Sequence, residues 1–174
     1  MTLSLLLPGT GCLVPGPGWT LVVHGRVRFT GTLKYGLDDD VVCQVELTPA
    51  KTALFLALAA CRAIDEREGR TGKLGCRCME DLAWLVAAVP GPGNPVTAAT
   101  IGGYKRRITR DIRKALESLS DAVGRQLDAP MPILNLGWGQ GYCLADEGLE
   151  LKGISIDELV ESVLRVETGR LHRI

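Results

Sequence analysis

Six cationic side chains lie close together in one short stretch of this chain. They are Lys105, Arg106, Arg107, Arg110, Arg113 and Lys114. Across the wider segment 97–119 only Asp111 and Glu117 oppose them, so six cations against two anions leave a local surplus of four positive charges. Guanidinium and ammonium groups are the side chains that bind phosphate oxygens. The chemistry that this stretch suggests is therefore contact with a nucleic-acid backbone.

The spacing of these cations fits one face of a helix. Residues placed at about 100° each divide the segment 97–119 into two sides. The apolar side holds Ile101, Tyr104, Ile108, Ile112, Ala115 and Leu119. The opposite side holds Arg106, Arg110 and Arg113, with Arg107 and Lys114 on one flank and Lys105 near the edge of the apolar stripe. The pattern predicts an amphipathic helix whose cationic face suits a DNA groove, although a solvated surface helix has the same pattern.

Length and composition favour a single folded unit. A chain of 174 residues with 46% hydrophobic and 23% charged residues can bury a real core. Its net charge is zero, so any attraction to nucleic acid must come from a local patch. The apolar run from Leu3 to Leu7 stops at Pro8, too short for a signal core or a membrane span. We expect a soluble, cytoplasmic protein without a membrane partner.

The cysteines form no recognisable ligand framework. There are six of them, at positions 12, 43, 61, 76, 78 and 143. Cys43 and Cys143 lie in apolar strand-like runs, where a free cysteine behaves as a small hydrophobic residue. Cys76 and Cys78 could join Cys61 or His24 in a zinc site, but a second pair at ligand spacing is missing. We therefore predict neither a metal nor a cofactor.

An enzyme is the least supported class of function. The sequence shows no nucleophile–base pairing and no carboxylate pair suited to catalysis. The loop containing Gly69, Gly72 and Lys73 resembles a phosphate-binding loop only superficially, because two residues separate its glycines where four are needed, and Leu74 follows the lysine.

The elements around the basic helix follow from turn and capping signals. Strand-like runs at 19–23, 26–30, 32–35 and 41–46 predict three or four antiparallel strands. Thr48 as N-cap and Pro49 at the first helical position begin an almost wholly apolar helix, which a loop from Asp65 to Gly75 follows.

Turn and capping signals also predict the elements of the second half of the chain. Residues 79–89 predict a second helix and 90–95 a stiff connection. Gly102-Gly103 weakens the start of the basic helix, whose regular part should begin near Tyr104, and 120–132 is a linker. Strand-like runs at 133–136 and 142–144 predict a hairpin with a glycine-rich tip, and a capping box at Ser155 and Glu158 opens an amphipathic helix to Glu167.

A small sheet, three helices of which the third is basic, and a hairpin follow one another in the order of a winged helix-turn-helix. The chain resembles the DNA-binding effector domain of OmpR/PhoB-type response regulators, without a receiver domain ahead of the sheet. Three segments carry the resemblance: LTPAKTALFL at 47–56, RDIRKALE at 110–117 and GQGYCL at 139–144.

The resemblance implies an α+β fold with three parts. Residues 1–18 form an N-terminal arm. Residues 19–145 form the winged-helix domain, with an N-terminal antiparallel sheet at 19–46, a three-helix core at 48–119 and a hairpin wing at 133–144. Residues 146–174 add a C-terminal amphipathic helix and an acidic tail.

The resemblance also implies roles for individual side chains. Lys105, Arg106, Thr109 and Arg110 would face DNA in the major groove, and Arg106 or Arg110 could fork onto a guanine edge or a phosphate. The other candidate contacts are Arg107, Arg113, Lys114, Thr97, Thr100, Trp138 and Gln140. N-capping alone explains one of the two threonines, and Trp138 could instead cover the core.

Two partners follow from this hypothesis, and one alternative function competes with it. The expected partner is double-stranded DNA, in a role as a transcriptional regulator. The C-terminal helix would either pack back on the domain or join a second copy in a homodimer, which suits a protein that reads two half-sites. A winged-helix module for protein–protein interaction, without DNA binding, is the alternative that the neutral net charge favours.

Overall fold

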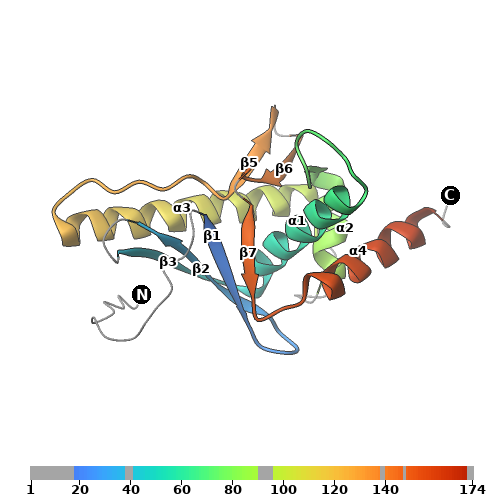
Figure 1. The fold of residues 1–174 in the computed structure, drawn as a ribbon, viewed down its shortest axis with the longest axis horizontal. Helices are drawn as coiled ribbons and strands as arrows, with labels where there is room; N and C mark the ends of the chain where they lie inside the picture. Colours follow the sequence, from blue (N-terminus) through green and yellow to red (C-terminus); the bar gives the residue numbers. More distant parts are fainter. Residues whose placement is uncertain (1–17, 38–40, 90–95, 138–139, 147, 172–174) are drawn as a thin grey trace.

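The computed structural model describes residues 18–37, 41–89, 96–137, 140–146 and 148–171, and shows a mixed α+β protein (Figure 1). Its strands are β1 (Trp19–His24), β2 (Thr30–Gly36), β3 (Val42–Leu47), β4 (Arg77–Cys78), β5 (Ile133–Leu136), β6 (Gly141–Leu144) and β7 (Leu149–Lys152). Its helices are α1 (Pro49–Arg67), α2 (Met79–Ala88), α3 (Ala98–Val123) and α4 (Ile156–Leu171). The predicted α+β class, with an N-terminal sheet and a later hairpin, is therefore confirmed at this level.

The larger sheet has the strand order β3-β2-β1-β7. β1 pairs antiparallel with β2, with Trp19 opposite Tyr35, and β2 pairs antiparallel with β3. β7 runs parallel to β1, with Leu149 opposite Trp19. The prediction of a separate strand at 26–30 is wrong, because residues 25–29 connect β1 to β2. The fourth strand comes instead from the segment predicted as an acidic tail. In this strand, leucine alternates with a charged residue over only four positions, which is too short a pattern to predict a strand. Its partner strand β1 lies about 130 positions earlier in the chain.

Helix α1 lies at the centre of the core. It is almost wholly apolar, and residues 52–61 are all buried, including Leu54, Phe55 and Leu58. Pro49 stands at its start as predicted, but the Thr48 side chain makes no capping hydrogen bond; its carbonyl accepts hydrogen bonds from Thr52 instead. The helix also continues to Arg67, so Asp65 belongs to its last turn and not to the following loop.

Helix α3 is continuous from Ala98, although Gly102 and Gly103 predicted a weak start. Both glycines are buried. A Cβ on Gly102 would make ordinary van der Waals contacts with the Tyr142 hydroxyl at 3.7 Å and the Met79 sulfur at 4.0 Å. Burial of the apolar side of α3, with Ile101 and Ile108 in the core, outweighs the cost of about 1 kcal/mol that each glycine imposes on a helix. The helix also runs four residues past the predicted end at Leu119, to a left-handed Gly124 at φ 70°.

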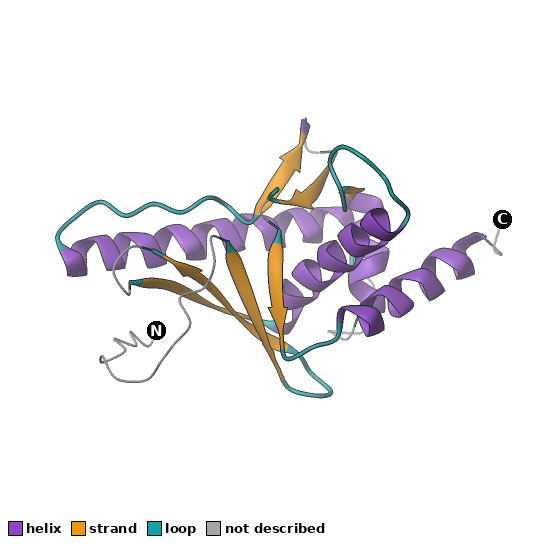
Figure 2. Ribbon diagram, viewed as in Figure 1, coloured by secondary structure: helices purple, strands orange, loops and turns teal. Residues whose placement is uncertain are grey.

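The predicted hairpin is present as β5 and β6, and it is joined by a strand that the sequence did not indicate. The smaller sheet has the order β4-β6-β5, and its strands are drawn in orange above α3 in Figure 2. Arg77 pairs with Tyr142, and Cys78 pairs with Gly141. β4 has only two residues and lies immediately before α2. It therefore fixes the hairpin to the helical part of the molecule.

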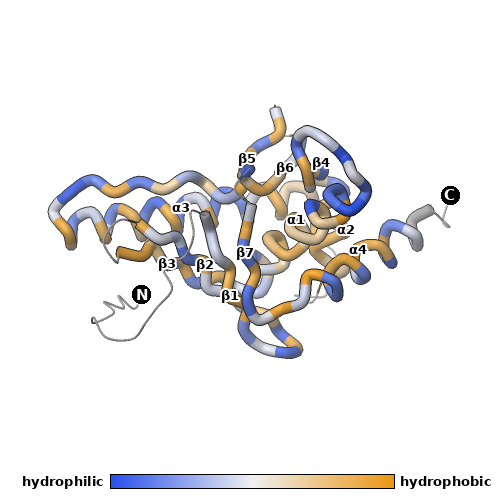
Figure 3. Tube along the Cα trace, in the orientation of Figure 1, coloured by the Kyte–Doolittle hydropathy of each residue, from blue (hydrophilic) through white to orange (hydrophobic). Residues whose placement is uncertain are grey.

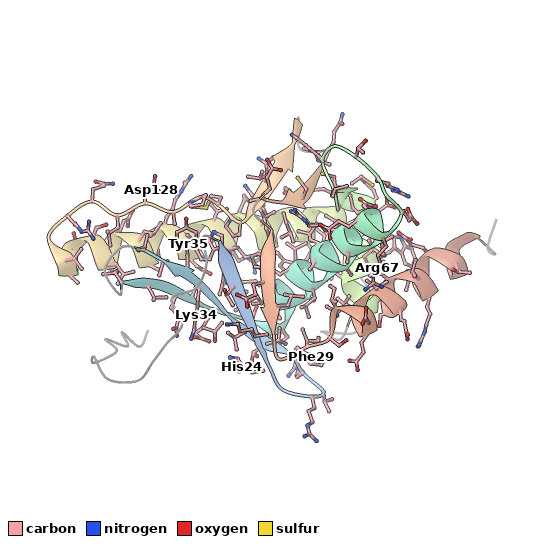
Figure 4. The ribbon with its side chains drawn as sticks, in the orientation of Figure 1. His24, Phe29, Lys34, Tyr35, Arg67 and Asp128 are labelled. Carbon is pink, nitrogen blue, oxygen red and sulfur yellow. The ribbon has the colours of Figure 1, made fainter. Side chains whose placement is uncertain are left out.

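The C-terminal helix packs on the body of the protein. Leu159, Val160 and Val163 of α4 are buried, and the helix contacts α1 and α2. Arg67, labelled in Figure 4, lies at the end of α1. It forms an ion pair with Asp157 in the first turn of α4. Packing back on the domain was one of the two predicted roles of this helix. Within the described residues, no helix is both long and apolar enough to cross a membrane.

Candidate nucleic-acid interface

The two sides of α3 differ sharply in exposure. Its apolar side is anchored by Ile101, Ile108 and Ile112, which are fully buried, and the helix contacts α1, α2 and β3. The side chains exposed on the opposite side are Arg106, Arg107, Arg110, Arg113 and Lys114, and we call this set the cationic face. Lys105 and Thr109 are half-buried at its border. In Figure 3 the helix accordingly alternates between hydrophilic and hydrophobic positions.

The cationic face is almost free of internal counter-charges. Asp111, the carboxylate within this stretch, binds the Lys51 ammonium of α1 at 2.5 Å. Its contact with the cationic face is one long approach of 3.7 Å to Arg110 Nε. In the part of the chain that the structure describes, the other four cations have no carboxylate oxygen within 4.0 Å. The positive charge of this surface is thus available to an external anion.

The charge of the exposed side of α3 changes from positive to negative towards the C-terminal end of the helix. Glu117 and Asp121 are exposed beyond Lys114, and Glu117 continues the row of Arg106, Arg110 and Arg113 at helical spacing. The cationic stretch therefore covers about ten residues, or roughly 15 Å at the helical rise.

The two threonines at the start of α3 serve the helix end. Thr97 Oγ1 accepts a hydrogen bond from the Thr100 backbone N–H at 3.2 Å and lies 3.0 Å from the Thr100 hydroxyl. Thr97 is therefore the N-cap, as one of the two interpretations predicted. Both hydroxyls are already engaged with each other, which weakens their case as phosphate donors.

The hairpin lies beside the first half of α3. Tyr142 of β6 covers Gly102, and the charge on Arg106 acts on its hydroxyl. Burial raises the pKa of Tyr142 above its ordinary value, and Arg106 partly opposes this rise. Gln140 is exposed at the hairpin tip, while its carbonyl accepts from the Met79 N–H at the start of α2. Trp138 lies outside the described residues.

A buried ion pair, which the sequence reading missed, holds β4 in place. Arg77 of β4 donates two hydrogen bonds to the Asp65 carboxylate, both 3.1 Å long, and the Gly75 N–H adds a third at 2.7 Å. The Asp65 side chain is 5% exposed and that of Arg77 is 13% exposed. Burial by itself would raise the pKa of Asp65, but the bonds from Arg77 and Gly75 hold it below its usual value. Asp65 and Arg77 are separated by a polar, glycine-rich loop, in which nothing marks them as partners.

The cysteines that the structure describes are free thiols. Among the described residues, no group of three or more His, Cys, Asp or Glu side chains is arranged to hold a metal ion. Cys61 is buried at the end of α1, where burial raises the pKa of its thiol to about 12. Cys43 is buried in β3, and the same cause raises its pKa to about 11. These two behave as core residues.

Comparison with known proteins assigns no family. No family model matches the chain, and neither a curated protein nor a solved structure matches it.

Proposed function

We propose that this protein is a DNA-binding regulator of the winged helix-turn-helix class, with α3 as the recognition helix and β5–β6 as the wing. The observation that carries the proposal is the cationic face of α3. It presents five exposed cations on one side of a helix whose other side is buried, and among the described residues its one carboxylate contact is the long approach of Asp111 to Arg110.

The dimensions of this surface suit a duplex. The major groove of B-DNA is about 12 Å wide and admits one α-helix. Arg106 and Arg110 stand one turn apart at the centre of the cationic face, where bidentate contact to guanine or phosphate is geometrically open. Arg107, Arg113 and Lys114 flank them and suit the phosphate backbone. Glu117 and Asp121 would repel phosphates, so the contact should end near Lys114.

The smaller sheet supports the second half of the proposal. β4 ties the hairpin to the start of α2, and Tyr142 packs it on α3 next to Arg106. The hairpin is thus held beside the proposed recognition helix, where its tip residue Gln140 could reach the DNA backbone. The sheet ahead of α1 agrees with the OmpR/PhoB-type resemblance in its first three strands, and its parallel fourth strand β7 is a departure from it.

Salt-dependent DNA binding tests the proposal directly. Fluorescence anisotropy with random and genomic duplexes would compare the wild type with Arg106→Ala/Arg110→Ala. We expect the double variant to lose at least tenfold in affinity and to show a flatter salt dependence, because each lost phosphate contact reduces the slope by about one. The matched control is Arg26→Ala/Arg28→Ala, which removes two exposed arginines from the β1–β2 connection and leaves α3 intact.

Two outcomes would count against this function. One is an absence of wild-type binding at low salt. The other is equal loss in the control, which would indicate an effect of overall charge and not of α3.

A module for protein interaction remains the second candidate, and specific surface residues favour it. Trp84 on α2 is 53% exposed and Leu164 on α4 is 41% exposed, in a chain of zero net charge. The same α4 surface is where a homodimer would form, and sedimentation of Leu164→Glu against wild type would test that arrangement. A cytoplasmic, non-enzymatic role accompanies both candidates.

A further inference from the structure

The pairing of β4 with β6 brings Cys76 and Cys143 close to each other. The register aligns Arg77 with Tyr142 and Cys78 with Gly141. Cys76 directly precedes β4, and the same register continued by one residue beyond Arg77 aligns it with Cys143. Residues opposite each other in an antiparallel pair have Cα atoms about 4.5 or 5.5 Å apart, depending on the type of pair. Both values fall within the range of about 4.4–6.8 Å that a disulfide requires.

The two thiols are near enough to influence each other. Burial is the main cause that raises the pKa of Cys76 to about 12, and the neighbouring Cys143 thiol raises it further. The Cys76 thiol itself lies 3.9 Å from the Leu74 carbonyl oxygen. Cys143 is buried, Cys76 is half-buried, and both are free thiols in this structure. Cys78, on the same face of β4, is engaged differently: its sulfur accepts the Asp81 N–H at 3.4 Å and caps α2. Cys78 is only a diagonal neighbour of Cys143 across the strands.

We propose that Cys76 and Cys143 are a site of disulfide formation, with a small disulfide such as oxidised glutathione as the oxidant. The Cys76 thiolate attacks the oxidant and forms a mixed disulfide, which releases one glutathione thiolate. The Cys143 sulfur then attacks the Cys76 sulfur and releases the second. The two protein thiols are oxidised, one glutathione disulfide is reduced to two thiols, and the two protons pass to these products.

The bond would tie the hairpin covalently to the segment before α2. It would reinforce β4, whose two residues and Asp65–Arg77 ion pair now hold the hairpin to the helices. This inference concerns the stability of the smaller sheet and does not depend on DNA binding.

The environment of Cys76 sets the rate of the reaction. Only the thiolate is nucleophilic, and a thiol with a raised pKa is mostly protonated at neutral pH. Between pH 7 and 9 the thiolate fraction, and with it the rate, should rise about tenfold per pH unit. The site is thus suited to slow, durable oxidation and not to rapid sensing.

Peptide mapping tests the proposal on the full chain. The protein is incubated with oxidised glutathione at pH 7, 8 and 9, blocked with iodoacetamide and digested with trypsin. Cleavage after Lys73, Arg77, Arg125 and Lys152 would release peptides 74–77 and 126–152. We expect these two peptides joined, with two hydrogen atoms lost. Because cleavage at Arg77 separates Cys76 from Cys78, the linked cysteine is identified without ambiguity.

Variants provide the matched comparison. Cys76→Ser and Cys143→Ser should each abolish the linked pair, whereas Cys78→Ser should retain it. Oxidised wild type should melt roughly 5 °C or more above Cys76→Ser treated in the same way, because the bond closes a long loop. Linkage through Cys78, or glutathione adducts on Cys76 without the linked pair at any of the three pH values, would overturn the proposal.

Discussion

Helices α1 and α3 pack against each other, yet they meet their surroundings in different ways. Every residue of α1 from Thr52 to Cys61 is buried, whereas α3 buries one side and exposes an arginine-rich one. A helix that is apolar all round belongs to a core, and an amphipathic one has a side left for other contacts. The comparison separates a helix whose middle is buried on all sides from a helix that leaves one cationic side exposed. Their substitutions should therefore fall into different classes, stability for α1 and binding for α3.

The largest expected effect is in the middle of α1. Phe55→Ala should lower the free energy of unfolding by about 3–5 kcal/mol, because it leaves a cavity among fully buried side chains. Urea unfolding followed by circular dichroism measures it. A loss below about 1 kcal/mol would show that α1 is not the centre of the core.

The next effect is at the end of α1, where Asp65→Asn removes one partner of the buried ion pair. We expect the free energy of unfolding to fall by about 3 kcal/mol near neutral pH, because the Arg77 charge stays buried without its carboxylate partner. Asp65 has a folded-state pKa below its ordinary value of 3.8, so its stabilising contribution is fully present above that pH. The contribution disappears as the pH falls through the lower, folded-state value.

Unfolding measured from pH 7 down to pH 3 should therefore show the difference between wild type and variant narrowing on the acid side. A difference that stays constant with pH would contradict the assigned role of this carboxylate. Glu66→Gln, one position further along on the exposed surface, is the matched control.

A smaller effect is expected where the two helices are joined. Lys51→Met removes the ion pair between α1 and Asp111 of α3 while keeping most of the apolar stem. Because the ion pair is partly exposed, we expect the free energy of unfolding to fall by about 1 kcal/mol. Lys34→Met, on the larger sheet, serves as the control for the change of side chain. A loss equal to that of Asp65→Asn would make this pair a second structural anchor.

The smallest effect on stability is expected on the outer side of α3, where binding should change instead. Glu117→Gln removes a carboxylate that continues the row of arginines, and stability should move by less than about 0.5 kcal/mol. If the cationic face binds DNA, affinity should rise severalfold at low salt and by less at high salt, since screening weakens the repulsion. Fluorescence anisotropy at a low and a high salt concentration would measure the two changes in affinity. Unchanged affinity would place the DNA contact elsewhere.

The sequence predicted those features that depend on local patterns. Hydrophobic periodicity located α3 and α4, the Pro49 signal located the start of α1, and the glycine-rich tip located the hairpin. The side on which the arginines of α3 lie also follows from helical spacing. Each of these results rests on interactions between residues a few positions apart, which the order of residues largely fixes.

Tertiary structure decided the features that depend on distant partners. It recruited β7 as a parallel strand beside β1, kept α3 helical through Gly102 and Gly103, and paired Asp65 with Arg77. It also brought Cys76 near Cys143, and it paired Asp111 with Lys51 more closely than with Arg110 of the cationic face. Short strands and buried polar pairs are stabilised by neighbours far along the chain, and their local sequences carry little signal. The residues alone therefore predict the basic helix. Only the folded molecule shows that Asp111 pairs with Lys51 and that the hairpin lies beside the helix.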